Sequence, residues 1–117
     1  MIARYTRPEM GAVWSEQQKL DNWLQVELAV VDALADAGVV PAGDARAIRE
    51  RGAFTVEAVN EREEITDHDV AAFVDVVAAS VGDEGRWFHH GLTSSDVLDT
   101  ALGLQLQQAG VILAAGA

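Results

Sequence analysis

Four groups of polar residues have the types and spacing that binding or catalysis needs, and the first lies near the N-terminus. Arg4 and Tyr5 stand side by side there. An arginine beside a tyrosine can bind a phosphate, the arginine through a charge-assisted hydrogen bond and the tyrosine through its hydroxyl. A surface arginine next to a packed tyrosine explains the same pair, and composition alone favours this plainer interpretation.

The second group is Thr66-Asp67-His68-Asp69, where a histidine lies between two carboxylates at the predicted start of a helix. A carboxylate can orient an imidazole and favour its protonated form, as general acid–base catalysis needs. The positive end of the helix dipole acts in the opposite direction and favours the neutral ring. A solvated polar cap, with Asp67 or Asp69 as the capping residue, is the alternative that the residues alone favour.

The third group is the pair His89-His90 in a predicted loop. Together with His68 and a carboxylate, the pair could in principle hold a metal ion. The spacing matches no standard ligand motif, however, and catalytic zinc takes about three protein ligands in a defined geometry. We therefore expect no metal site.

The fourth group spans residues 91–100, Gly-Leu-Thr-Ser-Ser-Asp-Val-Leu-Asp-Thr. Clustered hydroxyls and free backbone N–H groups at a helix N-terminus form an anion site that suits a carboxylate or a phosphate. Simple capping explains the same residues, because Thr, Ser and Asp are the residues that cap helices. Both interpretations stay open on the residues alone.

Helices must position these groups, since apolar residues recur at helical spacing and no strand-like alternation appears. Ser15, with Gln18 as its capping-box partner, predicts the start of a long amphipathic helix over residues 15–37. Glu27 is the one polar interruption of its apolar face. Further helices are expected over residues 44–51, 55–65 and 67–82 and from about 95 onward, with an extended lead-in over 1–14 and a loop over 81–91. The predicted fold class is all-α.

Composition narrows the classes of function. The chain has 117 residues, a formal net charge of -11 and no cysteine. So acidic a chain is a poor fit to nucleic acid or to an anionic membrane, and a chain without cysteine has no disulfide and no thiol nucleophile. We expect no apolar run that approaches membrane-spanning length and no export signal, so the expected location is the cytoplasm.

The last residues of the chain, 111–117, are apolar, and no charged residue follows Asp99. A final helix with so apolar a surface is expected to continue into further structure or to pack on a partner.

Three segments of the sequence resemble the bacterial adenylosuccinate lyases, in order and at the family's spacing. They are the opening MIARYTRPEM, residues 1–10, the segment HDVAAF, residues 68–73, and the segment HHGLTSSDVLDT, residues 89–100. The last segment is shared in looser form across the fumarase/aspartase superfamily, whereas the opening is more specific. The likeness covers the whole chain.

This resemblance implies an all-α enzyme, with an N-terminal helical domain over residues 1–92 and the beginning of a central helical bundle over residues 93–117. The implied reaction is β-elimination of fumarate from adenylosuccinate, which gives AMP, and from the succinylated aminoimidazole carboxamide nucleotide of purine biosynthesis. It also implies a homotetramer that needs no cofactor or metal and whose active sites each collect residues from three subunits.

The resemblance assigns roles to single residues. His68 matches the histidine discussed in the acid–base chemistry, and His89 matches the one placed near the nucleotide phosphate. Arg4 and Tyr5 match the nucleotide-contacting pair. The remaining substrate-binding positions are Asp67, Asp69, Thr93 and Ser94.

Two positions depart from the family pattern. Asp67 stands where Arg or Asn is common, and its carboxylate would repel an anionic substrate unless it points away or caps the helix. His90 stands where an aromatic residue is common.

The family's later catalytic histidine and its serine base fall beyond residue 117, so we expect these 117 residues alone to be inactive. Two other functions stay open. One is a different lyase of the superfamily, such as an argininosuccinate lyase, which the GLTSSD segment allows. The other is a stand-alone helical interaction module that binds a partner through its apolar C-terminal helix.

Overall fold

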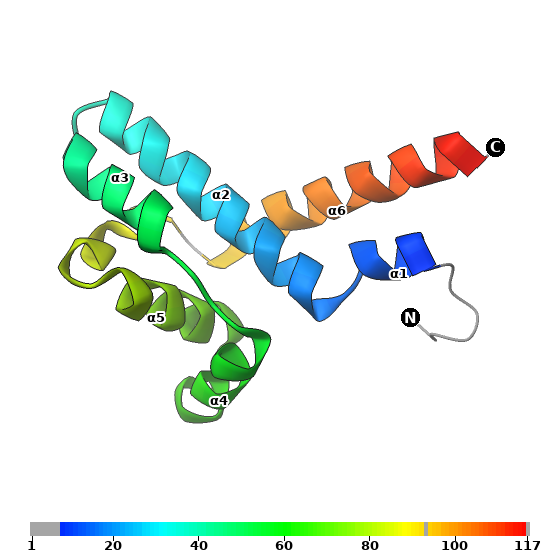
Figure 1. Ribbon diagram of the computed structural model, residues 1–117, viewed down its shortest axis with the longest axis horizontal. Helices are drawn as coiled ribbons and strands as arrows, with labels where there is room; N and C mark the ends of the chain where they lie inside the picture. The colour runs from blue at the N-terminus through cyan, green and yellow to red at the C-terminus, as the bar shows by residue number, and fades with distance from the viewer. Residues whose placement is uncertain (1–7, 93, 117) are drawn as a thin grey trace.

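The chain folds into helices joined by short connections (Figure 1). The computed structural model describes residues 8–92 and 94–116, and no strand occurs in these two ranges. The elements are α1 (Pro8–Val13), α2 (Glu16–Asp36), α3 (Ala42–Arg51), α4 (Val56–Thr66), α5 (Asp69–Val81), the 3₁₀ helix η2 (Asp83–Trp87) and α6 (Ser94–Gly116). The all-α fold class is confirmed.

The start of α2 follows the sequence prediction, with one correction. The Ser15 hydroxyl accepts the backbone N–H of Gln18 at 3.2 Å and so caps the helix. Gln18 does not complete a capping box, because the Ser15 N–H already donates to the Ala12 carbonyl in the turn after α1. The Gln18 side-chain amide donates instead to Asn22 Oδ1, one turn further along.

Two segments that were expected to be irregular contain helix. Pro8–Val13 form α1, since proline fits the first helical position, where its missing N–H has no partner to lose. Asp83–Trp87 form η2 inside the expected loop. The predicted helix at 44–51 is confirmed and begins two residues earlier, at Ala42. Thr55 caps α4 as predicted, by accepting the Ala58 N–H at 3.0 Å.

The core is organised around Phe73 on α5. Its ring meets Trp23 of α2 and Phe54 edge to face, at centroid distances of 5.5 and 5.4 Å, and lies 6.1 Å from Phe88. Aromatic pairs of this kind contribute about 0.5–1.5 kcal/mol each beyond the area they bury. Phe88 is 4% exposed, so the core fixes the chain immediately before His89.

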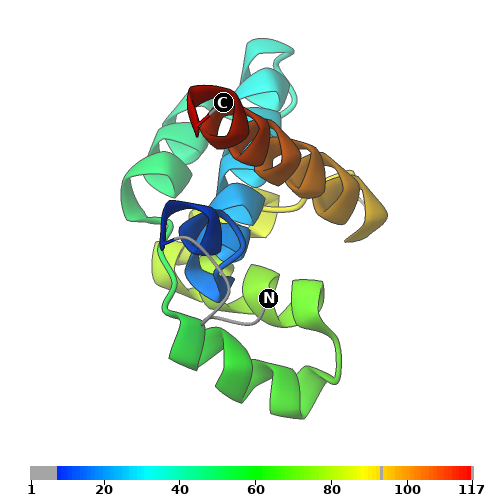
Figure 2. The ribbon, with the colours of Figure 1, turned by 90° about the vertical axis from the view of Figure 1, so that its right-hand side faces the viewer.

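Helix α2 separates two parts of the molecule. Figure 1 shows α3, α4 and α5 on one side of it and α6 on the other, and the turned view agrees (Figure 2). Polar contacts hold α6 in place: Gln105 donates to the Val13 carbonyl at 3.1 Å, and Asn22 donates to Gln108 at 3.4 Å. Helix α6 therefore rests on α1 and α2, and its buried residues Val97 and Ala101 belong to the same hydrophobic core as Phe73.

The outer face of α6 carries apolar side chains in contact with solvent. Leu106 is 58% exposed, Val111 66% and Leu113 63%. The predicted exposure of an apolar surface on this helix is confirmed for these residues. The red end of α6 in Figure 1 extends past α2, and helix α6 also contacts α1.

The segment Asp96–Ala115 of α6 is long and apolar enough to cross a membrane by length and composition alone. The expectation that no apolar run approaches this length is therefore wrong, because after Asp99 the helix has only uncharged residues. A core helix of a soluble protein meets the same two criteria, so they do not identify a membrane helix.

Candidate functional site

His68 caps α5 with its side chain. Its Nδ1 atom accepts the backbone N–H of Ala71 at 3.1 Å, and its backbone has the extended conformation that a capping residue needs. The prediction of Asp67 or Asp69 as the cap is therefore wrong. The ring stays half exposed, since 50% of the His68 side chain is open to solvent. An imidazole that caps through Nδ1 presents its Nε2 edge to a ligand.

The two carboxylates beside His68 have different surroundings. Asp67 ends α4 with a left-handed backbone, φ 53°, a conformation that Asp adopts more readily than most residues. Its side chain is exposed. Asp69 is the first residue of α5, and its Oδ1 atom lies 3.8 Å from His68 Nδ1 and accepts the Val70 N–H. Asp69 can therefore interact electrostatically with the His68 ring, whereas no hydrogen bond joins Asp67 to that ring.

Glu27 and His89 form a second polar cluster, inside the fold. The Oε1 atom of Glu27 lies 2.5 Å from His89 Nδ1. The Glu27 side chain is fully buried, and 21% of the His89 side chain is exposed. Burial raises the pKa of Glu27 above its ordinary 4.5, and the hydrogen bond and charge of His89 offset part of that rise. Glu27 Oε2 has no hydrogen-bond partner among the described residues.

The segment that carries His89 is fixed from several sides. A Cβ atom at Gly85 would come within 2.4 Å of the Ala78 carbonyl oxygen, so only glycine lets η2 pack this closely on α5. The Trp87 indole N–H donates to Asp44 of α3 at 3.0 Å. His89 itself has φ 66°, in the left-handed region that few residues other than glycine adopt and in which Asn, Asp and His are enriched.

The predicted site residues fall into three sets. His68 with Asp67 and Asp69 forms one cluster, and His89 belongs to another; no hydrogen bond or ion pair between the two is found in the described ranges. Ser94 begins α6, as predicted for this segment within one residue, but its side chain lies outside the described structure. Arg4, Tyr5 and Thr93 also lie outside the described residues.

Sequence reasoning missed Glu27 as a member of the site. The available signal was its place as the single polar residue on the apolar face of a long helix. A charged residue at such a position is buried when the helix packs, and a buried charge needs a partner. The identity of that partner, 62 residues away, is visible only in the fold.

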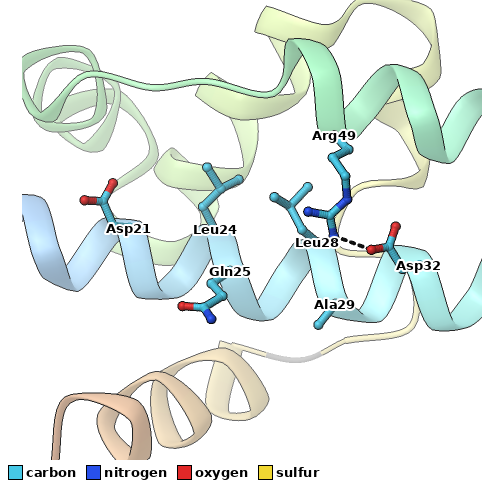
Figure 3. A pocket seen from close by; sticks show the side chains of 7 residues that line it. All are labelled: Asp21, Leu24, Gln25, Leu28, Ala29, Asp32 and Arg49. Atoms are coloured by element: carbon cyan, nitrogen blue, oxygen red, sulfur yellow. Dashed lines mark hydrogen bonds and ion pairs between the residues drawn. The ribbon is translucent and has the colours of Figure 1, made fainter. Parts of the chain in front are cut away.

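Residues 8–92 and 94–116 contain no group of three or more His, Asp or Glu side chains that could hold a metal ion. A surface pocket of about 460 Å³ lies between α2 and α3 (Figure 3). Leu24 and Leu28 point toward α3 in this view, and Arg49 reaches across to pair with Asp32. None of the predicted site residues that the structure describes lines this pocket.

A second pocket, of about 330 Å³, lies between α2 and α6 and is mostly apolar. Its polar residues are Gln25, Asp96 and Thr100, and the last two belong to the fourth motif identified in the sequence. The start of α6 therefore borders a cavity.

Several curated relatives of the chain carry the same name. The chain is 46% identical over 97% of its length to an adenylosuccinate lyase from Bacillus subtilis, and 51% identical over 93% to one from Aquifex aeolicus. It spans about a quarter of these relatives, 26% of each. The resemblance that the motifs indicated is confirmed. No family model matches the chain.

A solved structure gives the same picture of the fold. A fumarate lyase from Mesorhizobium sp. BNC1 superposes with a TM-score of 0.76 and 28% sequence identity. The match covers 84% of this chain and 24% of the other. The helical arrangement of this chain is therefore one that a fumarate lyase contains.

Proposed function

We propose that this chain, which matches adenylosuccinate lyases over nearly its whole length, supplies part of the active site of such an enzyme. In the proposed reaction the C–N bond between the purine amine and the succinyl group breaks. The neighbouring carbon loses a proton and the leaving nitrogen gains one, so that adenylosuccinate yields fumarate and AMP. The succinylated aminoimidazole carboxamide nucleotide reacts in the same way. The high identity to the Bacillus subtilis relative carries this proposal.

We assign His68 to the reacting part of the substrate. Its Nδ1 lone pair is occupied by the Ala71 N–H, so a neutral ring carries its proton on Nε2. The exposed Nε2–H can donate to a substrate carboxylate or to the leaving nitrogen. A doubly protonated ring would lose the capping contact, which supports a role for His68 as a hydrogen-bond donor in the elimination. Asp67 and Asp69 are its proposed substrate-contacting neighbours.

The remaining groups suit the anionic parts of the substrate. His89 is the proposed partner of the nucleotide phosphate, together with Arg4 and Tyr5. Thr93 and Ser94 are the proposed donors near the scissile bond, and Ser94 begins a 23-residue helix. A substrate with one phosphate and two carboxylates needs many such donors.

The charges of the chain support an active site that is completed by other parts of the enzyme. Four arginines already pair with carboxylates of the same chain, namely Arg49, Arg51, Arg62 and Arg86. The formal net charge of -11 leaves few cations for a substrate with three anionic groups. We propose that residues 93–117 begin a central bundle after an N-terminal domain over 1–92. In a cytoplasmic homotetramer, this bundle would bring groups from three subunits together without a cofactor.

A direct test is the turnover of adenylosuccinate by the purified enzyme that contains this chain. We expect release of fumarate and AMP, followed by the change in purine absorbance, and no turnover of argininosuccinate. Turnover of argininosuccinate alone would assign the chain to another lyase of the superfamily. No turnover of either substrate would contradict the proposal and favour a helical interaction module.

A further inference from the structure

We propose that Glu27 is a positioning residue for His89: its buried carboxylate binds Nδ1 and directs the Nε2 edge of the imidazole toward the substrate phosphate. This inference rests on the proposed function, because it takes the phosphate of the nucleotide as the ligand of His89. Glu27 itself would touch neither the substrate nor the reacting atoms.

The geometry of the pair carries the first step. Glu27 Oε1 and His89 Nδ1 are 2.5 Å apart, and they come from α2 and from the segment after η2, 62 residues later in the chain. The carboxylate is fully buried, whereas about a fifth of the imidazole side chain remains exposed. The Nδ1 edge of the ring therefore faces the buried carboxylate, which leaves Nε2 as the ring nitrogen available to a ligand.

The backbone supplies a second and independent observation. His89 adopts φ 66°, a left-handed conformation that few residues other than glycine have, although His adopts it more often than most. Such a conformation persists only where its surroundings hold it, and it is typical of functional sites. Phe88 is anchored in the core on one side, and the His90 ring lies 5.2 Å from Trp87 on the other. The chain thus places His89 against Glu27 through an uncommon backbone conformation.

The chemistry of the pair fits an anion-binding histidine. A carboxylate at Nδ1 fixes the ring orientation and stabilises the imidazolium, whose Nε2–H can then donate to a phosphate oxygen. Without Glu27 the ring could rotate, and Nδ1 would need another acceptor. Glu27 Oε2 has no hydrogen-bond partner in the described residues, so the contact with His89 is the interaction that offsets the cost of burying this carboxylate.

The experiment compares Glu27→Gln with Asn22→Leu in the enzyme that contains this chain. Asn22 is also on α2, is 1% exposed and makes side-chain hydrogen bonds to Gln18 and Gln108, so its loss reproduces the removal of a buried polar group that is not bonded to His89. Two substrates are used: adenylosuccinate and its nucleoside, which lacks the phosphate. Both KM and kcat are measured for each.

For Glu27→Gln we expect the KM for the nucleotide to rise about 10-fold or more, as is typical for loss of an orienting partner. The KM for the nucleoside and the kcat values should change far less, and Glu27→Asp should restore part of the nucleotide affinity. In a His89→Asn background, Glu27→Gln should have no further effect on KM. Asn22→Leu should not discriminate between the two substrates.

Equal losses with nucleotide and nucleoside, or the same pattern in Asn22→Leu, would overturn the inference and leave Glu27 a structural residue. Nitrogen NMR of His89 gives a readout that does not depend on turnover: Nδ1 should carry a proton in the unsubstituted protein, and Glu27→Gln should change that signal. An unsubstituted enzyme with no lyase activity would instead overturn the proposed function and with it the phosphate ligand. An unchanged Nδ1 signal would refute the positioning contact itself.

Discussion

The Nδ1 atom of His68 lies 3.1 Å from the backbone nitrogen of Ala71, so this imidazole both begins a helix and faces the solvent. The two roles use opposite edges of one ring. A substitution at this position therefore changes helix stability and chemistry together unless the replacement can still cap. Asparagine can cap, because its side-chain oxygen accepts the same N–H, and it cannot replace an imidazole Nε2–H in position.

His68→Asn and His68→Ala are expected to separate these roles. His68→Ala should lower the free energy of unfolding by about 1 kcal/mol through loss of the cap, whereas His68→Asn should leave it nearly unchanged. Both should lower kcat by about 100-fold or more if the ring acts on the substrate. Urea unfolding and steady-state turnover measure the two effects. Full activity in His68→Asn would reduce His68 to a capping residue.

His89→Ala is expected to destabilise the protein in a pH-dependent way. Removing the imidazole leaves a fully buried carboxyl group without its partner, which costs about 3 kcal/mol when the group is charged. Folding raises the pKa of Glu27 above 4.5, so the folded state binds the proton more tightly than the unfolded state. The contribution of Glu27 to stability is therefore fully present below pH 4.5, and it is lost as the pH rises through the pKa of Glu27 in the folded state.

The decrease in the free energy of unfolding caused by His89→Ala should accordingly be small near pH 4.5 and should grow as the pH rises toward 7. Urea unfolding at a series of pH values measures it. The double variant Glu27→Leu/His89→Ala is the control, because it has no buried carboxyl group left to titrate. A penalty that stays constant with pH, or that persists in the double variant, would show that Glu27 is not its source.

Asp67→Asn is expected to improve substrate binding slightly. The exposed carboxylate stands beside His68, where an anionic substrate would be repelled, and Asn accepts the same left-handed backbone. Removal of one exposed charge should lower the KM by about threefold, an effect that added salt should reduce. Asp36→Asn, which makes the same change of charge at the end of α2, is the control. An equal shift in both variants would indicate an effect of net charge only.

The exposed apolar face of α6 is expected to cause association when residues 1–117 are produced alone. Leu102 and Leu106 are 46% and 58% exposed, so burying them against a second surface is favourable. The variant Leu102→Glu/Leu106→Glu should shift the protein to monomer in sedimentation velocity, without loss of helical circular dichroism. Val39→Glu, at an apolar residue that is 47% exposed outside α6, should leave association unchanged. The same 117 residues should show no detectable lyase activity.

The sequence by itself determined the helices and their limits where a local signal exists. Ser15, Thr55 and the glycine at 38 mark helix ends through contacts within a few residues, so reading along the chain is enough to find them. Apolar periodicity determined the fold class for the same reason. It failed at α1, because Pro8 disfavours helix only at the residue before it and not at the residues after it. It also failed in the 3₁₀ helix at 83–87, because five residues are too few for a periodic apolar pattern to appear.

Only the tertiary structure decided which polar residues meet. Nothing near Glu27 in the sequence points to His89, because the pair forms when α2 and the segment after η2 converge on the same aromatic core. The cap of α5 was misassigned because any of three adjacent polar residues could cap a helix that begins here, and the backbone geometry selects His68. Contacts between distant residues depend on how the helices pack. A carboxylate is buried only where a hydrogen-bond partner is buried with it, and the sequence pattern around the carboxylate does not identify that partner.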